Sequence, residues 1–405
     1  MSRTFHQDLI LNQWVLSLFN QQDLKAFKDR LGDKEGIASD GQTEFFHELT
    51  NQLFETDLIS HNDLRRYDLN IIKHWQQITE QRNKTEGHIL NLKYFQYLSL
   101  LFAEIYLDFY FNHPEKLLSQ LNAQLKAHLA EDAQAPEFQS YTKEDLNKIA
   151  FWNATGSGKT LLMHVNILQY LDYCKNRHDL TVFVITPNEG LSKQHLNEFI
   201  ASNLSATIFD RNKGVQSNGL FNDIQIIEIS KLSEKTGEST VAVESFSSMN
   251  KLILIDEGHR GSSGNEWLSR RQRMIGDGFA FEYSATFGQA VKDRKTVVDM
   301  QFEIQKKLGK AQGISKKADV QKLSLSYADK QEARQKSVFE TYAKCVLFDY
   351  SYKFFYADGY GKESLILNMK AEDYDNAENL QKYFIACLLS FYQQQYLFAK
   401  HQPKL

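Results

Sequence analysis

The chain has 405 residues, of which 42% are hydrophobic and 24% are charged, with a formal net charge of −4. This composition is typical of a globular protein large enough for two or three domains, and it excludes a wholly disordered chain. The slightly acidic balance also excludes an overall basic field, so that any contact with nucleic acid must come from a local cluster.

The first part of the chain, from about residue 5 to 129, is predicted to be helical, because its apolar residues recur three and four positions apart. Its most apolar stretch, Leu92 to Phe111, is interrupted by charged and polar residues at nearly every turn, which predicts a buried helix and not a membrane span. Residues 130–142 (AEDAQAPEFQSYT) are small, acidic and interrupted by proline. They suit an exposed connection, so we expect residues 1–142 to form a helical accessory domain.

Residues 143–290 alternate short apolar runs with segments of helix length. The runs are Ile149 to Trp152, Leu180 to Thr186, Ala206 to Phe209, Ile224 to Ile229, Leu252 to Ile255 and Phe279 to Ser284. This alternation predicts an α/β fold, a parallel sheet with crossover helices. Ligands of such sheets bind at the carboxyl ends of the strands.

The pattern degrades beyond Phe287, through a stretch rich in Lys and Gln. Long aromatic segments around Phe339 to Tyr356 and Leu380 to Phe398 are then predicted to be helical. We expect residues 291–405 to be a mostly helical insertion or connector.

A glycine-rich turn, ATGSGKT at residues 154–160, follows a predicted strand and opens a predicted helix. Glycines let backbone amides approach phosphates, Lys159 neutralises β/γ-phosphate charge, and Thr160 offers its hydroxyl to magnesium. Asn153 occupies the position where the usual pattern begins with glycine. The expected ATP contacts are Thr155, Gly156, Ser157, Gly158, Lys159 and Thr160.

An acidic pair, Asp256 and Glu257, stands directly after another predicted buried strand. Two adjacent carboxylates there would be costly without a cation. Asp256 is predicted to hold magnesium, through water, and Glu257 to orient the water that attacks the γ-phosphate. With Lys159 they form the expected catalytic set.

Over about residues 148–290 the chain resembles superfamily 2 helicases. ATGSGKT looks like motif I, DEGH at 256–259 resembles the DEAD/DEAH box with Gly258 in place of the commoner alanine, and SAT at 284–286 resembles motif III. The wordings FWNATGSGKT, TPNEGLSKQHL, DEGHRGSSG and EYSATFGQA are most similar to the helicase subunits of type III restriction enzymes and related defence ATPases.

The resemblance implies a RecA-like P-loop NTPase lobe, a parallel sheet with flanking helices, preceded here by the helical domain. It also implies ATP and Mg2+ as cofactors, DNA, expected to be duplex, as a partner, and a modification or nuclease subunit as a further one. His259, Ser284 and Thr286 would couple nucleotide state to the grip on nucleic acid. The SAT triplet alone fits equally well small residues that end a strand.

Contacts with nucleic acid and with adenine are expected at three places. The segment Phe183 to Phe199 is similar to motif Ia, in which Thr186, Ser192, Lys193 and Gln194 could donate to phosphates, or could only cap a helix. Arg260 begins a basic segment that either grips DNA or is a solvated helix face. By the resemblance, Gln96 within YFQYL is a candidate adenine reader, or equally a residue at the edge of a helical core.

A superfamily 2 motor closes two lobes over ATP, and the second supplies an arginine finger. After Thr286 the chain has only Arg294 and Arg334, neither in a Q-x-x-R-x-x-R-like context. The second lobe is therefore expected to be missing, and the chain to be an N-terminal fragment of a longer motor. The triplet at 293–295 matches a nuclease only in spelling, so no nuclease is assigned.

The leading hypothesis is the ATP-binding lobe of a DNA-directed helicase or translocase from a restriction or phage-defence enzyme, a weak ATPase by itself. The alternative is a non-catalytic protein whose ATP-bound state switches on a partner, but a switch needs no water-activating Glu257. A metabolic P-loop kinase would leave the segments like motifs Ia and III unexplained. The three cysteines lack the spacing of a zinc site or a disulfide scaffold, which favours a reducing cytoplasm.

Overall fold

The structure is a computed structural model that describes most of the chain. The described residues are 5–53, 58–131, 139–176, 179–210, 224–233, 241–242, 246, 250–257, 273–287, 295–314, 316–361 and 377–401. They divide into two compact units, residues 1–357 and 358–405.

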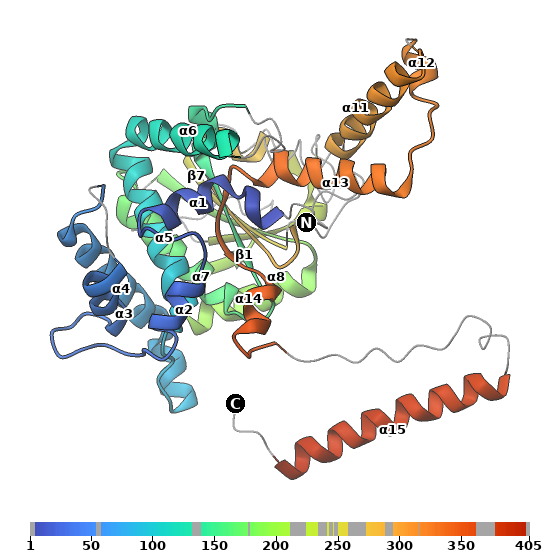
Figure 1. The fold of residues 1–405 in the computed structure, drawn as a ribbon. Coiled ribbons are helices and arrows are strands. Elements are labelled where there is room, and N and C mark those ends of the chain that lie inside the picture. Colours follow the sequence, from blue (N-terminus) through green and yellow to red (C-terminus); the bar gives the residue numbers. More distant parts are fainter. Residues whose placement is uncertain are drawn as a thin grey trace. The chain divides into compact units, whose positions relative to one another are not determined.

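A seven-stranded sheet, with every pair of neighbouring strands parallel, forms the centre of the first unit (Figure 1). Its strands are β1 (Lys148–Asn153), β2 (Leu180–Thr186), β3 (Ala206–Ile208), β4 (Ile224–Glu228), β7 (Asn250–Asp256), β8 (Phe279–Ser284) and β9 (Val346–Tyr350). Their order is β3-β4-β2-β7-β8-β1-β9, and β5 (Leu232–Ser233) pairs separately with β6 (Val241–Ala242). All six strands that the sequence predicts are present, in a RecA-like α/β lobe.

Alternation of side chains along the strands builds a separate core on each face of the sheet. In β2, Val182 and Val184 belong to the larger core, whereas Phe183 and Ile185 belong to the core on the opposite face. Because both faces are covered, the strands are continuous apolar runs, as expected of a buried parallel sheet. Ala150 of β1 lies in a third, smaller cluster with residues of β9 and its flanks.

The region before the sheet is helical, as predicted. Its helices are α1 (Ile10–Ser17), α2 (Lys25–Leu31), α3 (Glu44–Glu48), α4 (His61–Glu86), α5 (Tyr94–Asn112) and α6 (Pro114–Glu131). Ser60 and Asp63 form a capping box that starts α4, and Gly87 in the left-handed conformation ends it. Helix α5 is buried over nearly its whole length, and its side chains share the larger core with the sheet.

None of the described helices is long and apolar enough to cross a membrane. This holds for α5 despite its apolar sequence, and it agrees with the prediction of a buried helix for that stretch. The domain limits expected at residues 142 and 290 stay predictions. Within the first unit, the larger core extends from Ile10 in α1 to Tyr350 in β9.

Crossover helices α7 (Lys159–Tyr173) and α8 (Glu189–Ala201) follow β1 and β2, and both contribute to the larger core. After the sheet come α11 (Lys295–Ala311), α12 (Lys317–Val320), α13 (Tyr327–Tyr342) and α14 (Tyr352–Ala357). In Figure 1, α11 and α13 lie side by side and extend away from the sheet.

The helix predicted around Phe339 to Tyr356 is wrong in its middle, because Val346–Tyr350 forms the edge strand β9 beside β1. All five residues of this strand are buried. A short, continuously apolar run has no periodicity that separates a buried strand from a buried helix. Its pairing with β1 decided the outcome.

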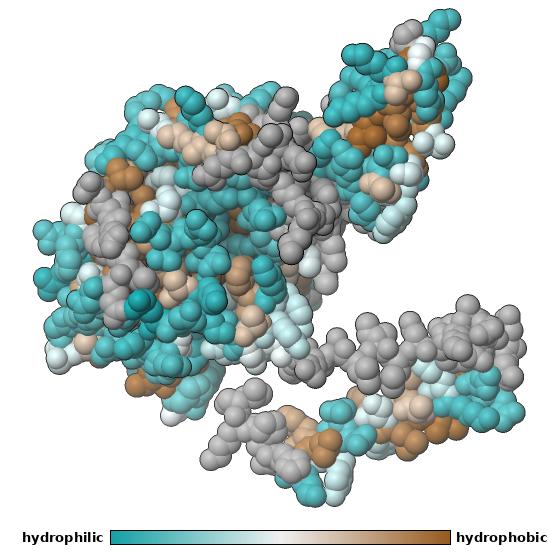
Figure 2. All heavy atoms as spheres, viewed as in Figure 1, coloured by the Kyte–Doolittle hydropathy of each residue, from teal (hydrophilic) through white to brown (hydrophobic). Residues whose placement is uncertain are grey.

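The second unit contains α15 (Ala377–His401). The apolar side chains of this helix are exposed, and Figure 2 shows them gathered along it at the lower right. The exposed set comprises Phe384, Ile385, Leu388, Leu389, Phe391, Tyr392, Tyr396, Leu397 and Phe398.

Candidate functional site

The candidate site lies where the carboxyl ends of three neighbouring strands meet. Trp152 of β1 pairs with Ser284 of β8, and Tyr283 of β8 pairs with Asp256 of β7. The glycine-rich turn, the acidic pair and the SAT segment are therefore neighbours in space, at the sheet edge where open α/β folds bind ligands.

The turn between β1 and α7 has the backbone of a phosphate loop. Gly156 and Gly158 have φ angles of 89° and 88°, a left-handed conformation that suits glycine. Gly158 is the N-cap of α7, and none of the described side chains caps this helix end. Its first amide groups and positive dipole end are therefore available to an anion.

Other residues of the loop fill supporting positions. The position of Asn153 does not require glycine, because this residue ends β1 and its φ angle is not positive. Thr155 is exposed, and Thr160 is half-buried in the first turn of α7. Ser157 is buried, and its hydroxyl has no hydrogen-bond partner among the described residues.

Lys159, the first residue of α7, faces both carboxylates. Its ammonium group forms a close ion pair with Glu257 and lies 3.9 Å from Oδ1 of Asp256. All three side chains are less than one-fifth exposed, so each charge needs the others. Glu257 adopts a left-handed φ of 49°, and its backbone N–H donates to the carbonyl of Tyr283 at 3.0 Å.

Asp256 is held on its other side by a histidine that sequence analysis did not select. His195 of α8 places Nε2 2.9 Å from Oδ2 of Asp256. Burial would raise the pKa of Asp256, but the His195 hydrogen bond and the nearby Lys159 charge outweigh it, so the pKa lies below its usual value. Oδ1 of Asp256 is buried and has no hydrogen-bond partner among the described residues.

The structure brings Gln96 to the phosphate loop. Its side-chain amide donates from Nε2 to the carbonyl of Ser157 at 3.1 Å, and Oε1 accepts from the backbone N–H of Lys93 at 3.0 Å. A Cβ on Gly158 would lie 2.5 Å from Nε2 of Gln96. In this structure Gln96 therefore supports the loop and the start of α5, and its reading of adenine stays a prediction.

The SAT segment follows β8 beside the loop. Ser284 is buried, and its Oγ accepts from the backbone N–H of Thr286 at 3.1 Å. The indole N–H of Trp152 donates to the carbonyl of Ala285 at 2.9 Å, which ties this segment to β1. His259, the third expected coupling residue, lies outside the described residues.

The residues expected to contact nucleic acid divide by exposure. Thr186 and Ser192 are buried and share a hydrogen bond of 2.6 Å between their hydroxyls. Lys193 and Gln194 are exposed at the start of α8, where Lys193 pairs with Glu189 at 2.8 Å. Arg260 lies outside the described residues.

His195 is the functional candidate that sequence reasoning missed. It stands three residues after Ser192 and four before Phe199, so its helix face is the one that turns toward the core. That spacing predicts that the His195 side chain is buried, but it does not indicate which residue forms a hydrogen bond with it. Asp256, 61 positions later, reaches His195 only because β2 and β7 are neighbours in the sheet.

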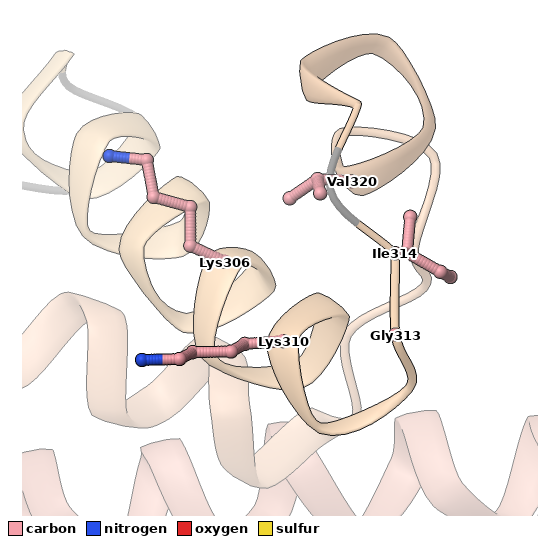
Figure 3. Close-up of a pocket in the computed structure, with 5 residues that line it drawn as sticks. All are labelled: Lys306, Lys310, Gly313, Ile314 and Val320. Carbon is pink, nitrogen blue, oxygen red and sulfur yellow. The ribbon is translucent and has the colours of Figure 1, made fainter.

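A cavity of about 350 Å3 lies elsewhere, between α11, the turn that follows it and α12 (Figure 3). Its lining comprises Lys306, Lys310, Gly313, Ile314 and Val320. Figure 3 shows both lysine ammonium groups turned away from Ile314 and Val320. The cavity contains none of the predicted site residues.

A comparison with known proteins identifies a related family. The family model described as type III restriction enzyme, res subunit, matches residues 111–289, which contain the glycine-rich loop, the acidic pair and the SAT segment. No curated protein matches the sequence. The matched family is one of helicase-like ATPases, which generally use ATP and magnesium. Residues 111–289 of this chain are thus similar to the res subunits of type III restriction enzymes.

Proposed function

We propose that residues 143–290 form the ATP-binding lobe of a DNA-directed helicase or translocase of the type III restriction kind, working in the cytoplasm. Residues 1–142 act as a helical accessory domain, and residues 291–405 as an insertion or connector. The observation that carries this proposal is the cluster of Lys159, Asp256 and Glu257 beside a loop with two left-handed glycines.

Lys159 and Glu257 give the site two states. In the structure, the ammonium group of Lys159 is paired with the carboxylate of Glu257. ATP phosphates in the loop would compete for that ammonium, since the backbone amides of the α7 N-terminus hold them next to it. Glu257 would then be free to accept a hydrogen bond from the attacking water and to orient it.

Asp256 and Thr160 fit a magnesium ion. Oδ1 of Asp256 is buried and has no hydrogen-bond partner among the described residues, and Thr160 stands one residue after the lysine. The described residues contain no cluster of three His, Cys, Asp or Glu side chains suited to a metal. Magnesium needs none, because it keeps waters and phosphate oxygens as most of its ligands. When bound, it would neutralise phosphate charge.

The arginine finger of this motor is proposed to come from outside the lobe. The described part of residues 290–405 contributes one strand, β9, to the first sheet and contains no second sheet. Arg294 lies outside the described residues, and Arg334 lies in α13. Because such an arginine accelerates hydrolysis by roughly 10³ to 10⁵, this chain, as a fragment of a longer motor, should hydrolyse ATP slowly.

DNA, expected to be duplex, is the proposed nucleic-acid partner, and a modification or nuclease subunit the proposed protein partner. The exposed Lys193 and Gln194 support a contact with a phosphate backbone. His259, Ser284 and Thr286 are proposed to link this contact to the nucleotide state.

The test is ATP affinity and steady-state hydrolysis of the purified chain, with and without duplex DNA, beside Lys159→Ala. We expect ATP binding that the variant loses, together with slow turnover. Absence of ATP binding would contradict the proposal. Fast turnover stimulated by DNA would contradict the missing second lobe while leaving the ATP site intact. Binding without any turnover, even with added partner lobe, would favour the switch protein.

A further inference from the structure

His195 is the best-placed buried polar group that the proposed mechanism leaves unused. Its ring lies in α8, is almost fully buried, and meets Asp256 through one hydrogen bond of 2.9 Å. An ionised carboxylate can only accept, so the proton of this bond belongs to Nε2 of His195. Nδ1 has no hydrogen-bond partner among the described residues, which leaves the contact with Asp256 as the polar interaction of this ring.

The bond decides which oxygen of Asp256 faces the phosphate loop. With Oδ2 bonded to His195, Oδ1 is turned toward Lys159, at 3.9 Å from its ammonium group. Rotation of the carboxylate would break the bond to a buried donor, which costs about 1–3 kcal/mol for the group left unsatisfied. Oδ2 of Asp256 thereby stays bonded to α8, and Oδ1 faces the phosphate loop.

Helix α8 is itself fixed, so it can serve as a support. At its C-terminal end, Arg82 of α4 donates to the carboxylate of Glu198 at 2.6 Å and to the backbone carbonyl of the same residue at 3.0 Å. At its start, the side chain of Asn188 caps the helix by accepting from the N–H of Leu191. The N-terminal helical region thus anchors the helix that holds Asp256.

We propose that His195 is a positioning residue for magnesium, which orients the Asp256 carboxylate so that Oδ1 faces the water shell of an ion bound with ATP. The inference rests on the proposed function. Removal of a group that orients a metal-binding side chain typically lowers metal affinity about tenfold to a hundredfold. Loss of His195 should therefore weaken the response to magnesium more than the binding of nucleotide itself.

The experiment compares His195→Gln with His195→Asn in the full chain. A glutamine amide nitrogen can take the place of Nε2, whereas the shorter asparagine cannot reach Asp256. His164→Asn is the matched control, because His164 is also buried near α8 but bonds to Ser202 at 2.9 Å instead of to Asp256.

The measured quantity is the ratio of ATP dissociation constants in EDTA and in MgCl2, alongside thermal melting of each variant. His195→Asn should lower this ratio by at least about tenfold, with unchanged affinity in EDTA, while the glutamine variant and the control keep it. This pattern is one that a purely structural role of His195 would not produce.

Two outcomes would overturn the inference. One is that His195→Asn keeps the wild-type ratio of dissociation constants, and the other is that a folded His195→Gln has a ratio at least about tenfold lower. If the asparagine variant does not fold, the glutamine variant alone decides, since it must keep the wild-type ratio. A wild-type chain that binds no ATP would instead contradict the proposed function, so the two failures are distinguishable.

Discussion

Lys159→Ala should destabilise the protein even when no nucleotide is present. The ammonium group lies against Glu257 and 3.9 Å from Asp256, in surroundings that exclude most solvent. One ion pair at about 4 Å, in an effective dielectric of about 20, is worth roughly 4 kcal/mol before the desolvation of lysine is subtracted. Truncating one partner of a buried pair accordingly costs about 3 kcal/mol.

Thermal melting without nucleotide would reveal this cost. For a cooperative unit of 357 residues, an unfolding entropy of about 2.1 cal/mol/K per residue converts 3 kcal/mol into a fall in Tm of about 4 °C. Lys159→Ala combined with Glu257→Gln should recover part of the loss, because it removes one of the carboxylates left without a cation.

The fall in Tm caused by Lys159→Ala should depend on pH. The pKa of Asp256 is lowered in the folded protein, so its stabilisation is present above the unfolded pKa of about 4 and is lost as pH falls through the folded value. Without Lys159, one of the interactions that lower the pKa of Asp256 is lost, so this pKa should rise and protonation should relieve part of the penalty. The difference in Tm between wild type and variant should therefore shrink from about pH 7.5 to about pH 5. An unchanged Tm at neutral pH, or a double variant no more stable than the single one, would refute this reasoning.

Three further predictions concern single side chains. Glu257→Gln should lower ATP hydrolysis at least about a hundredfold without weakening ATP binding, because a neutral amide no longer holds Lys159. Single-turnover hydrolysis and ATP titration measure the two effects. Weaker ATP binding in the variant would count against the proposed competition between Glu257 and phosphate for Lys159. Gly158→Ala should lower ATP affinity about tenfold, since φ is 88° and the new Cβ would lie 2.5 Å from Nε2 of Gln96. Adding Gln96→Ala should recover the part of the affinity that is lost to this steric clash. If no affinity is recovered, the whole loss comes from backbone strain. Burial raises the pKa of Glu104 to about 7, against the opposing hydrogen bond from Tyr173, so its contribution to folding stability is full below pH 4.5 and is lost as pH rises through about 7. The free energy of unfolding in urea should therefore change by about 3 kcal/mol across this range in the wild type but not in Glu104→Gln. An identical pH profile in the variant would contradict this role of Glu104.

Local patterns were sufficient to predict most of the lobe. The six apolar runs of residues 149–284 became strands, and the glycines of ATGSGKT adopt the left-handed turn that the motif requires. These are properties of a few consecutive residues, because a buried parallel strand is a continuous apolar run and a positive φ favours glycine. Asp256 and Glu257 could be placed at a strand end for the same reason.

Tertiary structure alone decided which distant side chains meet. Val346–Tyr350 became a strand because the edge of β1 was open to pairing, which no local periodicity could indicate. Gln96 reaches the phosphate loop, and His195 reaches Asp256, across 61 positions each, while Lys159 meets Glu257 across 98. The sequence by itself determined the strands, the loop and the chemistry available at their ends. Packing of helices on a parallel sheet determined the partners, because it brings separate strand ends and helix faces together irrespective of their distance along the chain.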